Sequence, residues 1–180
     1  MFDSTRLLLE VINIDKSFKP DSIEGGPGEG TRHYKVPGLG HQVAVAHTDV
    51  TSDFLHWGKT SEINDKVAMH SIKWDAVYDK KRPAPSNVAK RKILIHGLKG
   101  AMDTVEHITK KNPAAIIHGD PASAKHSSIY KKMLLNKGHD FIDDGHDIYS
   151  WKSNTGHEHD IRRVLDVNNY GKNYRKDTPY

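Results

Sequence analysis

Apolar residues recur along this chain with two different periods, and a basic, proline-containing segment at residues 79–85 separates them. Before this segment apolar and polar residues alternate, most clearly over residues 42–50 (QVAVAHTDV) and 67–78 (VAMHSIKWDAVY). Alternation with a period of two is typical of strands that bury one face. The turn at residues 37–40 (PGLG) follows a shorter strand-like run at 33–36, so we predict a hairpin there.

Between residues 90 and 141 the pattern becomes that of strands alternating with helices. Short β-branched runs near residues 92–96 and 114–118 each end in His-Gly and predict two buried strands. After the first run, apolar residues at helical spacing predict a helix that ends before Asn112-Pro113. These residues are Leu98, Ala101, Met102, Val105 and Ile108. We expect a second helix from Ser123 to Gly138.

Further strands are predicted at residues 139–141 and 146–152. Strands joined through a helix run parallel and form a right-handed crossover. The predicted fold class is therefore α/β (α+β), a single mixed-sheet domain with antiparallel strands first and two strand–helix units after them.

Composition changes once more after residue 152. Residues 1–152 hold all the predicted elements and suit one domain with a substantial core. Residues 153–180 are polar and basic and contain Tyr170, Tyr174 and Tyr180. This segment has little to bury, so we predict that it forms a tail.

The overall composition excludes several classes of chemistry. The chain of 180 residues has no cysteine, which excludes disulfides, thiolate catalysis and thiolate metal sites. Its formal charge of +4 is mild, so nucleic-acid binding is possible but is not indicated by charge alone. No apolar run has the length of a membrane span, and the N-terminus lacks the layout of a signal peptide. We therefore expect no membrane partner and a location in the cytoplasm or in a particle assembled there.

The second half of the chain resembles part of the general N-acetyltransferase (GNAT) fold, and in particular the divergent GNAT-like proteins of bacteriophages. The resemblance covers about a third of the chain. It rests on a proline before a strand, an Ile-Tyr-x-x-Met pattern on the next helix, and a glycine and an aromatic residue after that helix. The matching residues are Pro113, Ile129, Tyr130, Met133, Gly138 and Phe141.

This resemblance implies an N-acyltransferase that uses acetyl-CoA, or a degenerate relative of one. In such enzymes, backbone amides of a loop that opens a helix hold the cofactor pyrophosphate, and a tyrosine on the next helix lies near the thiolate. The matching loop here would comprise Gly97, Leu98, Lys99, Gly100 and Ala101, and Tyr130 would be the general acid. The loop departs from the family's pattern, since no Gln or Arg occupies the expected place.

The 13 histidines form the basis of a second hypothesis. His47-Thr48-Asp49 and His118-Gly119-Asp120 each follow an apolar run, so two strand-borne histidines could act as acid and base on a phosphodiester. The two His-Asp pairs could instead hold a divalent metal. Surface histidines without a function are the third interpretation. We expect His47 and His118 not to converge.

A third hypothesis assigns no catalysis to the chain. In this interpretation the GNAT-like body is a component of a phage-derived particle in the host cytoplasm or the virion. Residues 168–180 would then contact neighbouring subunits, with Tyr170 and Tyr174 as anchors and Lys172, Arg175 and Lys176 around them.

Overall fold

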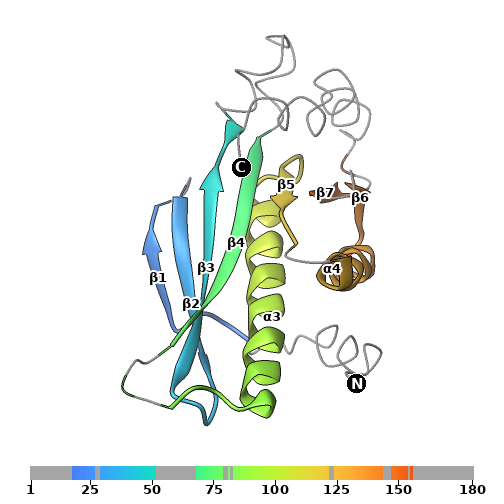
Figure 1. The fold of residues 1–180 in the computed structure, drawn as a ribbon. Helices are drawn as coiled ribbons and strands as arrows, with labels where there is room; N and C mark the ends of the chain where they lie inside the picture. Colours follow the sequence, from blue (N-terminus) through green and yellow to red (C-terminus); the bar gives the residue numbers. More distant parts are fainter. Residues whose placement is uncertain are drawn as a thin grey trace, which may run out of the picture.

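The fold of the chain is given by a computed structural model (Figure 1). It describes residues 18–26, 29–51, 68–78, 81, 83–121, 124–143, 147–153 and 155. The described elements follow in the order β1 (Ser22–Gly25), β2 (Glu29–Val36), β3 (His41–Asp49), β4 (Met69–Val77), α3 (Asn87–Lys111), β5 (Ile116–Gly119), α4 (Ala124–Asn136), β6 (His139–Asp143) and β7 (Ile148–Lys152).

The strands form one mixed sheet in the order β1-β2-β3-β4-β5-β7-β6. β1 to β4 are an antiparallel meander, and β5, β7 and β6 are a second antiparallel group. The parallel pairing of β4 with β5 joins the two groups. The predicted mixed α/β sheet with antiparallel strands first is confirmed, as are the strands expected around residues 42–50, 67–78, 114–118 and 146–152.

The strand predicted near residues 92–96 is wrong, because α3 runs without a break from Asn87 to Lys111. The Ser86 side chain caps this helix by accepting a hydrogen bond from the Ala89 amide at 3.2 Å. Buried residues recur on one face from Ala89 onward, so the apolar run belongs to a helical pattern that starts earlier. The first strand–helix unit is therefore β4 followed by α3, and the second is β5 followed by α4.

Both helices cover the same face of the sheet. The registers place Tyr34, Val45, Trp74 and Ile117 on one face, and these residues belong to a single apolar cluster with buried residues of α3 and α4. In Figure 1, α3 lies along β2, β3 and β4, while α4 lies near β6 at the other end of the sheet. One face of the sheet thus contains the main core of the described domain.

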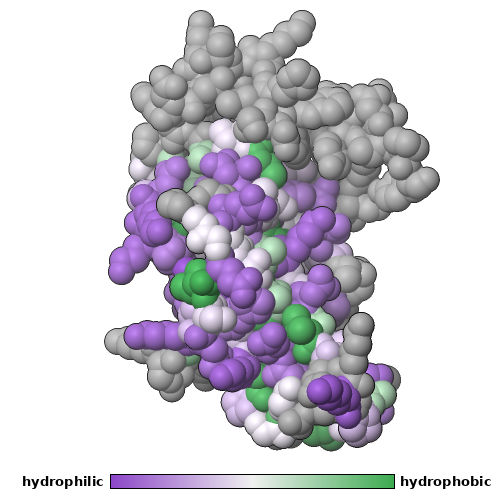
Figure 2. Space-filling view, turned by 90° about the vertical axis from the view of Figure 1, so that its left-hand side faces the viewer, coloured by the Kyte–Doolittle hydropathy of each residue, from purple (hydrophilic) through white to green (hydrophobic). Residues whose placement is uncertain are grey.

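The edge of the sheet at β1 is short and polar. All four residues of β1 are exposed, including Ile23. Figure 2 shows this side of the molecule as mainly hydrophilic, with isolated hydrophobic residues among the parts that are coloured. A short polar edge strand offers little for another chain to pair with.

Two glycines let α3 approach the sheet closely. A Cβ atom added to Gly97 would overlap the indole ring of Trp74, and one added to Gly100 would lie 2.8 Å from Tyr34 Cε2 and 2.9 Å from Val45 Cγ2. Such separations are too short for side-chain atoms that cannot move. The aromatic rings therefore occupy the space that glycine leaves on the helix surface.

A partly buried ion pair links α3 to β2 one turn further along the helix. Arg32 is almost completely buried, and its Nη1 donates to Asp103 Oδ2 at 2.9 Å. The Tyr34 hydroxyl donates to the same oxygen at 2.7 Å. Burial, with the Asp103 carboxylate adding to it, raises the pKa of the Tyr34 phenol above its ordinary value, so Tyr34 stays a hydrogen-bond donor.

We predict that Gly97→Ala and Gly100→Ala each destabilise the protein by roughly 1–2 kcal/mol. Alanine favours a helix interior over glycine, but the overlap with Trp74 or Tyr34 costs more than that preference contributes. Chemical denaturation measures the free energy of unfolding. Lys110→Ala on the exposed side of the same helix is the control, with an expected change within about 0.5 kcal/mol. A stabilised glycine variant would contradict the close packing.

His139, at the start of β6, is buried with an exposure of 1%. Burial of the imidazole, with Lys152 adding to the effect, lowers its pKa to about 4. The unfolded chain takes up a proton near pH 6.5, and the folded protein does so only near pH 4. Falling pH therefore favours the unfolded chain across this window.

We predict that His139 alone lowers the free energy of unfolding by about 3 kcal/mol between pH 7 and pH 4. In His139→Leu this part of the pH dependence should disappear, because leucine has no proton to bind. Urea unfolding of both proteins at pH 7 and pH 4.5 measures the difference. Equal losses of stability in the wild type and the variant would show that folding does not lower the pKa of His139.

Candidate functional site in the opening between β4 and β5

β4 and β5 separate after a short stretch of pairing. Their parallel register extends from Met69 opposite Ile116 to Ile72 opposite Gly119. β4 then continues to Val77, paired with β3 on its other side. The chain leaves β5 at Asp120 and Pro121 and enters α4. In the described part of the chain, the edge of β4 beyond Ile72 therefore has no strand beside it on the β5 side.

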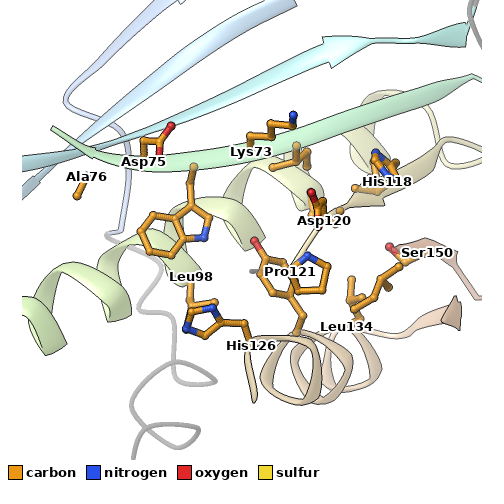
Figure 3. A pocket seen from close by; sticks show the side chains of 17 residues that line it. Lys73, Asp75, Ala76, Leu98, His118, Asp120, Pro121, His126, Leu134 and Ser150 are labelled. Atoms are coloured by element: carbon orange, nitrogen blue, oxygen red, sulfur yellow. The ribbon is translucent and has the colours of Figure 1, made fainter. Parts of the chain in front are cut away.

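A cavity of about 390 Å³ occupies this opening. One wall is the segment of β4 from Ile72 to Ala76, and the floor is formed by Leu98 and Val105 of α3. α4 closes the opposite side with His126, Tyr130 and Leu134, and the remaining wall comes from β5 and β7. Figure 3 shows His126 and Leu134 on the α4 side and Lys73 and Asp75 on β4 across from them. The cavity is thus lined by β4, β5, β7, α3 and α4, where the two antiparallel strand groups join.

The polar groups around the cavity lie on two sides of the sheet. Lys73 and Asp75 project from β4 on the side away from α4 (Figure 3), and both are exposed. His126 and Tyr130 face the cavity from the helix side. A ligand in the opening would therefore meet charged side chains on one side of the sheet and an imidazole and a phenol on the other.

Tyr130 lies in the cavity wall, half-buried among apolar residues. Burial raises the pKa of its phenol above the ordinary value, and a hydrogen bond with the Trp74 side chain partly offsets the rise. Since the indole Nε1 is only a donor, the Tyr130 oxygen accepts this bond and its own proton remains available. The arrangement supplies a neutral O–H donor inside the cavity.

The five residues predicted as a cofactor loop do not form a loop. Gly97, Leu98, Lys99, Gly100 and Ala101 lie in the middle of α3, where their amides belong to the helix. The prediction that this segment opens a helix is therefore wrong. The two glycines serve close packing instead, and among the five Leu98 lines the cavity through its side chain.

The two His-x-Asp segments lie on opposite faces of the sheet, as expected. His47 pairs with Ile72, which in turn pairs with Gly119, so His118 points to the other face. His47 is buried on the face that α3 covers. Among the residues that the structure describes, no group of three or more His, Asp or Glu side chains could hold a metal ion.

Some polar residues of this region were not identified from the sequence. Ser71 Oγ lies 3.2 Å from His118 Nδ1, and Asp147 Oδ1 lies 3.3 Å from His118 Nε2. Ser71 and Asp147 lie 76 positions apart in the sequence. Their proximity depends on strand order and register, and no local motif indicates it.

No family model, no curated protein and no solved structure matches this chain. Neither of the two described helices is long and apolar enough to cross a membrane. The predicted tail contacts of residues 168–180 lie outside the described residues.

Proposed function

We propose that the opening between β4 and β5 binds the acyl end of acetyl-CoA or a related acyl thioester, and that the protein is an N-acyltransferase or a binding protein derived from one. The observation that carries this proposal is the cavity beside a free strand edge, with the Tyr130 hydroxyl in its wall. A mixed sheet with antiparallel strands first, as in the resembling GNAT fold, also supports it.

The free edge of β4 suits a ligand that contains amides. Backbone N–H and C=O groups that face a cavity need partners. The pantetheine arm of coenzyme A is narrow and carries amide groups, so it can lie along residues 73–76 as an added strand does. The adjoining walls, Leu98, Val105 and Leu134, would contact its apolar parts.

The N-terminus of α3 offers a place for the anionic end of such a ligand. It lies about 16 Å from Leu98 at the helical rise per residue. The first turn of α3 has no acidic residue, and Lys90 and Arg91 follow. The helix dipole and these cations favour a pyrophosphate at this end. The proposed anion site is therefore the N-terminus of α3 at Asn87. It lies ten residues before Gly97, the first residue of the predicted loop.

Tyr130 has the properties of a donor to a leaving thiolate. In the proposed reaction an amine nitrogen attacks the thioester carbonyl, an amide bond forms and the carbon–sulfur bond breaks. The nitrogen releases its proton to solvent, the thiolate receives one from the Tyr130 hydroxyl, and the Tyr130 phenolate then regains a proton from solvent. The raised pKa of Tyr130 keeps this group protonated in the resting protein.

We predict that acetyl-CoA raises the melting temperature of the wild-type protein and that Ala76→Trp abolishes this effect. The half-buried Ala76 lines the cavity, so an indole there would fill it. Val77→Trp is the control, since Val77 is 39% exposed and outside the cavity lining. Ligand at 100 times its Kd stabilises by about 2.7 kcal/mol. Folded wild-type protein that is not stabilised by millimolar acetyl-CoA would overturn the proposal.

We predict that Tyr130→Phe keeps acetyl-CoA binding but lowers turnover by about 10²- to 10⁴-fold, because phenylalanine cannot protonate the thiolate. Release of free coenzyme A is measured with a panel of primary amines and peptide N-termini. Thermal shifts for Tyr130→Phe and the wild type should agree. Unchanged turnover in the variant would remove Tyr130 as the acid, and binding without turnover in the wild type would identify a non-catalytic protein.

A further inference from the structure

Three adjacent strands bring a serine, a histidine and an aspartate together on the sheet face opposite α3. Ser71 comes from β4, His118 from β5, and Asp147 immediately precedes β7. Ser71 and His118 are directly paired in the parallel register, and His118 is paired with Tyr149. The His118 ring packs against the Tyr149 ring with centroids 5.3 Å apart. The imidazole is therefore held from both neighbouring strands.

Both nitrogens of His118 have partners within the chain. Nε2 lies 3.3 Å from Asp147 Oδ1, and Nδ1 lies 3.2 Å from Ser71 Oγ. A carboxylate beside Nε2 favours the tautomer with the proton on Nε2. Nδ1 is then the acceptor, and the proton that it can accept is that of the Ser71 hydroxyl. Because both ring nitrogens already have partners, we expect His118 to activate Ser71 and not to deprotonate a substrate directly.

The three side chains are reachable from solvent. Ser71 is half-buried, and the side chains of His118 and Asp147 are 20% and 16% exposed. His118 also lines the cavity between β4 and β5, whose lining does not include Ser71. A serine, an acceptor nitrogen and a carboxylate in this order are the parts of a nucleophilic triad, and distances slightly beyond 3.2 Å are usual before substrate binds.

We propose that Ser71, His118 and Asp147 form an acyl-transfer site in which Ser71 is a nucleophile toward carboxylic esters of small acyl groups. This proposal does not depend on the binding of a thioester. Relative to the common serine hydrolases, the two ring nitrogens exchange roles, because the serine is at Nδ1 and the carboxylate at Nε2.

The reaction balances with water as the second substrate. Ser71 Oγ bonds to the ester carbonyl carbon while its proton passes to His118 Nδ1. The ester carbon–oxygen bond then breaks, and the leaving alcoholate takes the proton from His118. Water attacks the acyl-serine next and gives a proton to His118. The acyl carbon–oxygen bond to Ser71 then breaks, Ser71 Oγ takes that proton from His118, and the acid and the free serine are released. Asp147 is a positioning residue that holds the imidazole and stabilises its charged form.

The test is covalent labelling of the full chain with a fluorophosphonate probe, followed by mass spectrometry of the Ser71 peptide. The probe phosphorus bonds to Ser71 Oγ and fluoride leaves. We expect labelling of the wild type, loss of labelling in Ser71→Ala, and a rate at least about 100-fold lower in His118→Gln. Thr48→Ala is the control, since Thr48 is paired with Ser71 across β3 and β4 and is exposed. Its labelling should equal that of the wild type.

The test of Asp147 must distinguish its role in positioning the His118 imidazole from an effect on the stability of the folded protein. Asp147→Asn should slow labelling, whereas Asp147→Glu should restore part of the rate, with similar free energies of unfolding for both variants. Wild-type protein that is folded by circular dichroism and is not labelled at Ser71 would overturn the proposal. Labelling that persists in Ser71→Ala would do so as well. Both outcomes are independent of acetyl-CoA, which is absent from the assay.

Discussion

The close approach of α3 to the sheet is the constraint on which the rest of the described structure depends. Gly97 lies against the Trp74 ring and Gly100 against Tyr34 and Val45, so the helix axis is held near β2, β3 and β4. The ion pair of Arg32 with Asp103 fixes the same helix at its next turn. Trp74, seated on Gly97, also reaches Tyr130 of α4 through a hydrogen bond. One packing contact thus sets the distance between α3 and the sheet and the position of the tyrosine in the cavity.

The elements with an unambiguous period could be predicted from the sequence. β3 and β4 alternate because one of their faces is covered by α3. α4 ends at Asn136, and Gly138 soon after it has a positive φ of 71°, as glycines that follow a helix often do. Ile93-Leu94-Ile95 could not be assigned in this way. A short β-branched run looks the same in a buried strand and on the buried side of a helix. The cap at Ser86 and the helical spacing of buried residues from Ala89 onward distinguish the two.

The candidate site was predictable only in part, for a related reason. The sequence pattern identified Tyr130 on a helix, and the structure places it in a cavity wall. The glycines at 97 and 100 suggested an anion loop because glycine has the same freedom in loops and in tight helix packing. The cavity itself arises where β4 and β5 separate, and Ser71 meets Asp147 through the order of three strands. Strand order and register are non-local properties, so no short segment encodes them.

Among the described strands, one parallel junction, from Met69–Ile116 to Ile72–Gly119, joins the two antiparallel groups. Pairings within each group connect strands that are mostly near in sequence, whereas this junction closes a loop that contains all of α3. Loop closure of this kind is slow and entropically costly, and it follows local pairing in folding. The order of assembly is therefore expected to place the meander and the β5–α4–β6–β7 unit first and the docking of β5 on β4 last. The cavity and the Ser71–His118 pair then form in the final step. A ligand that contacts both β4 and β5 would therefore stabilise the pairing that forms last.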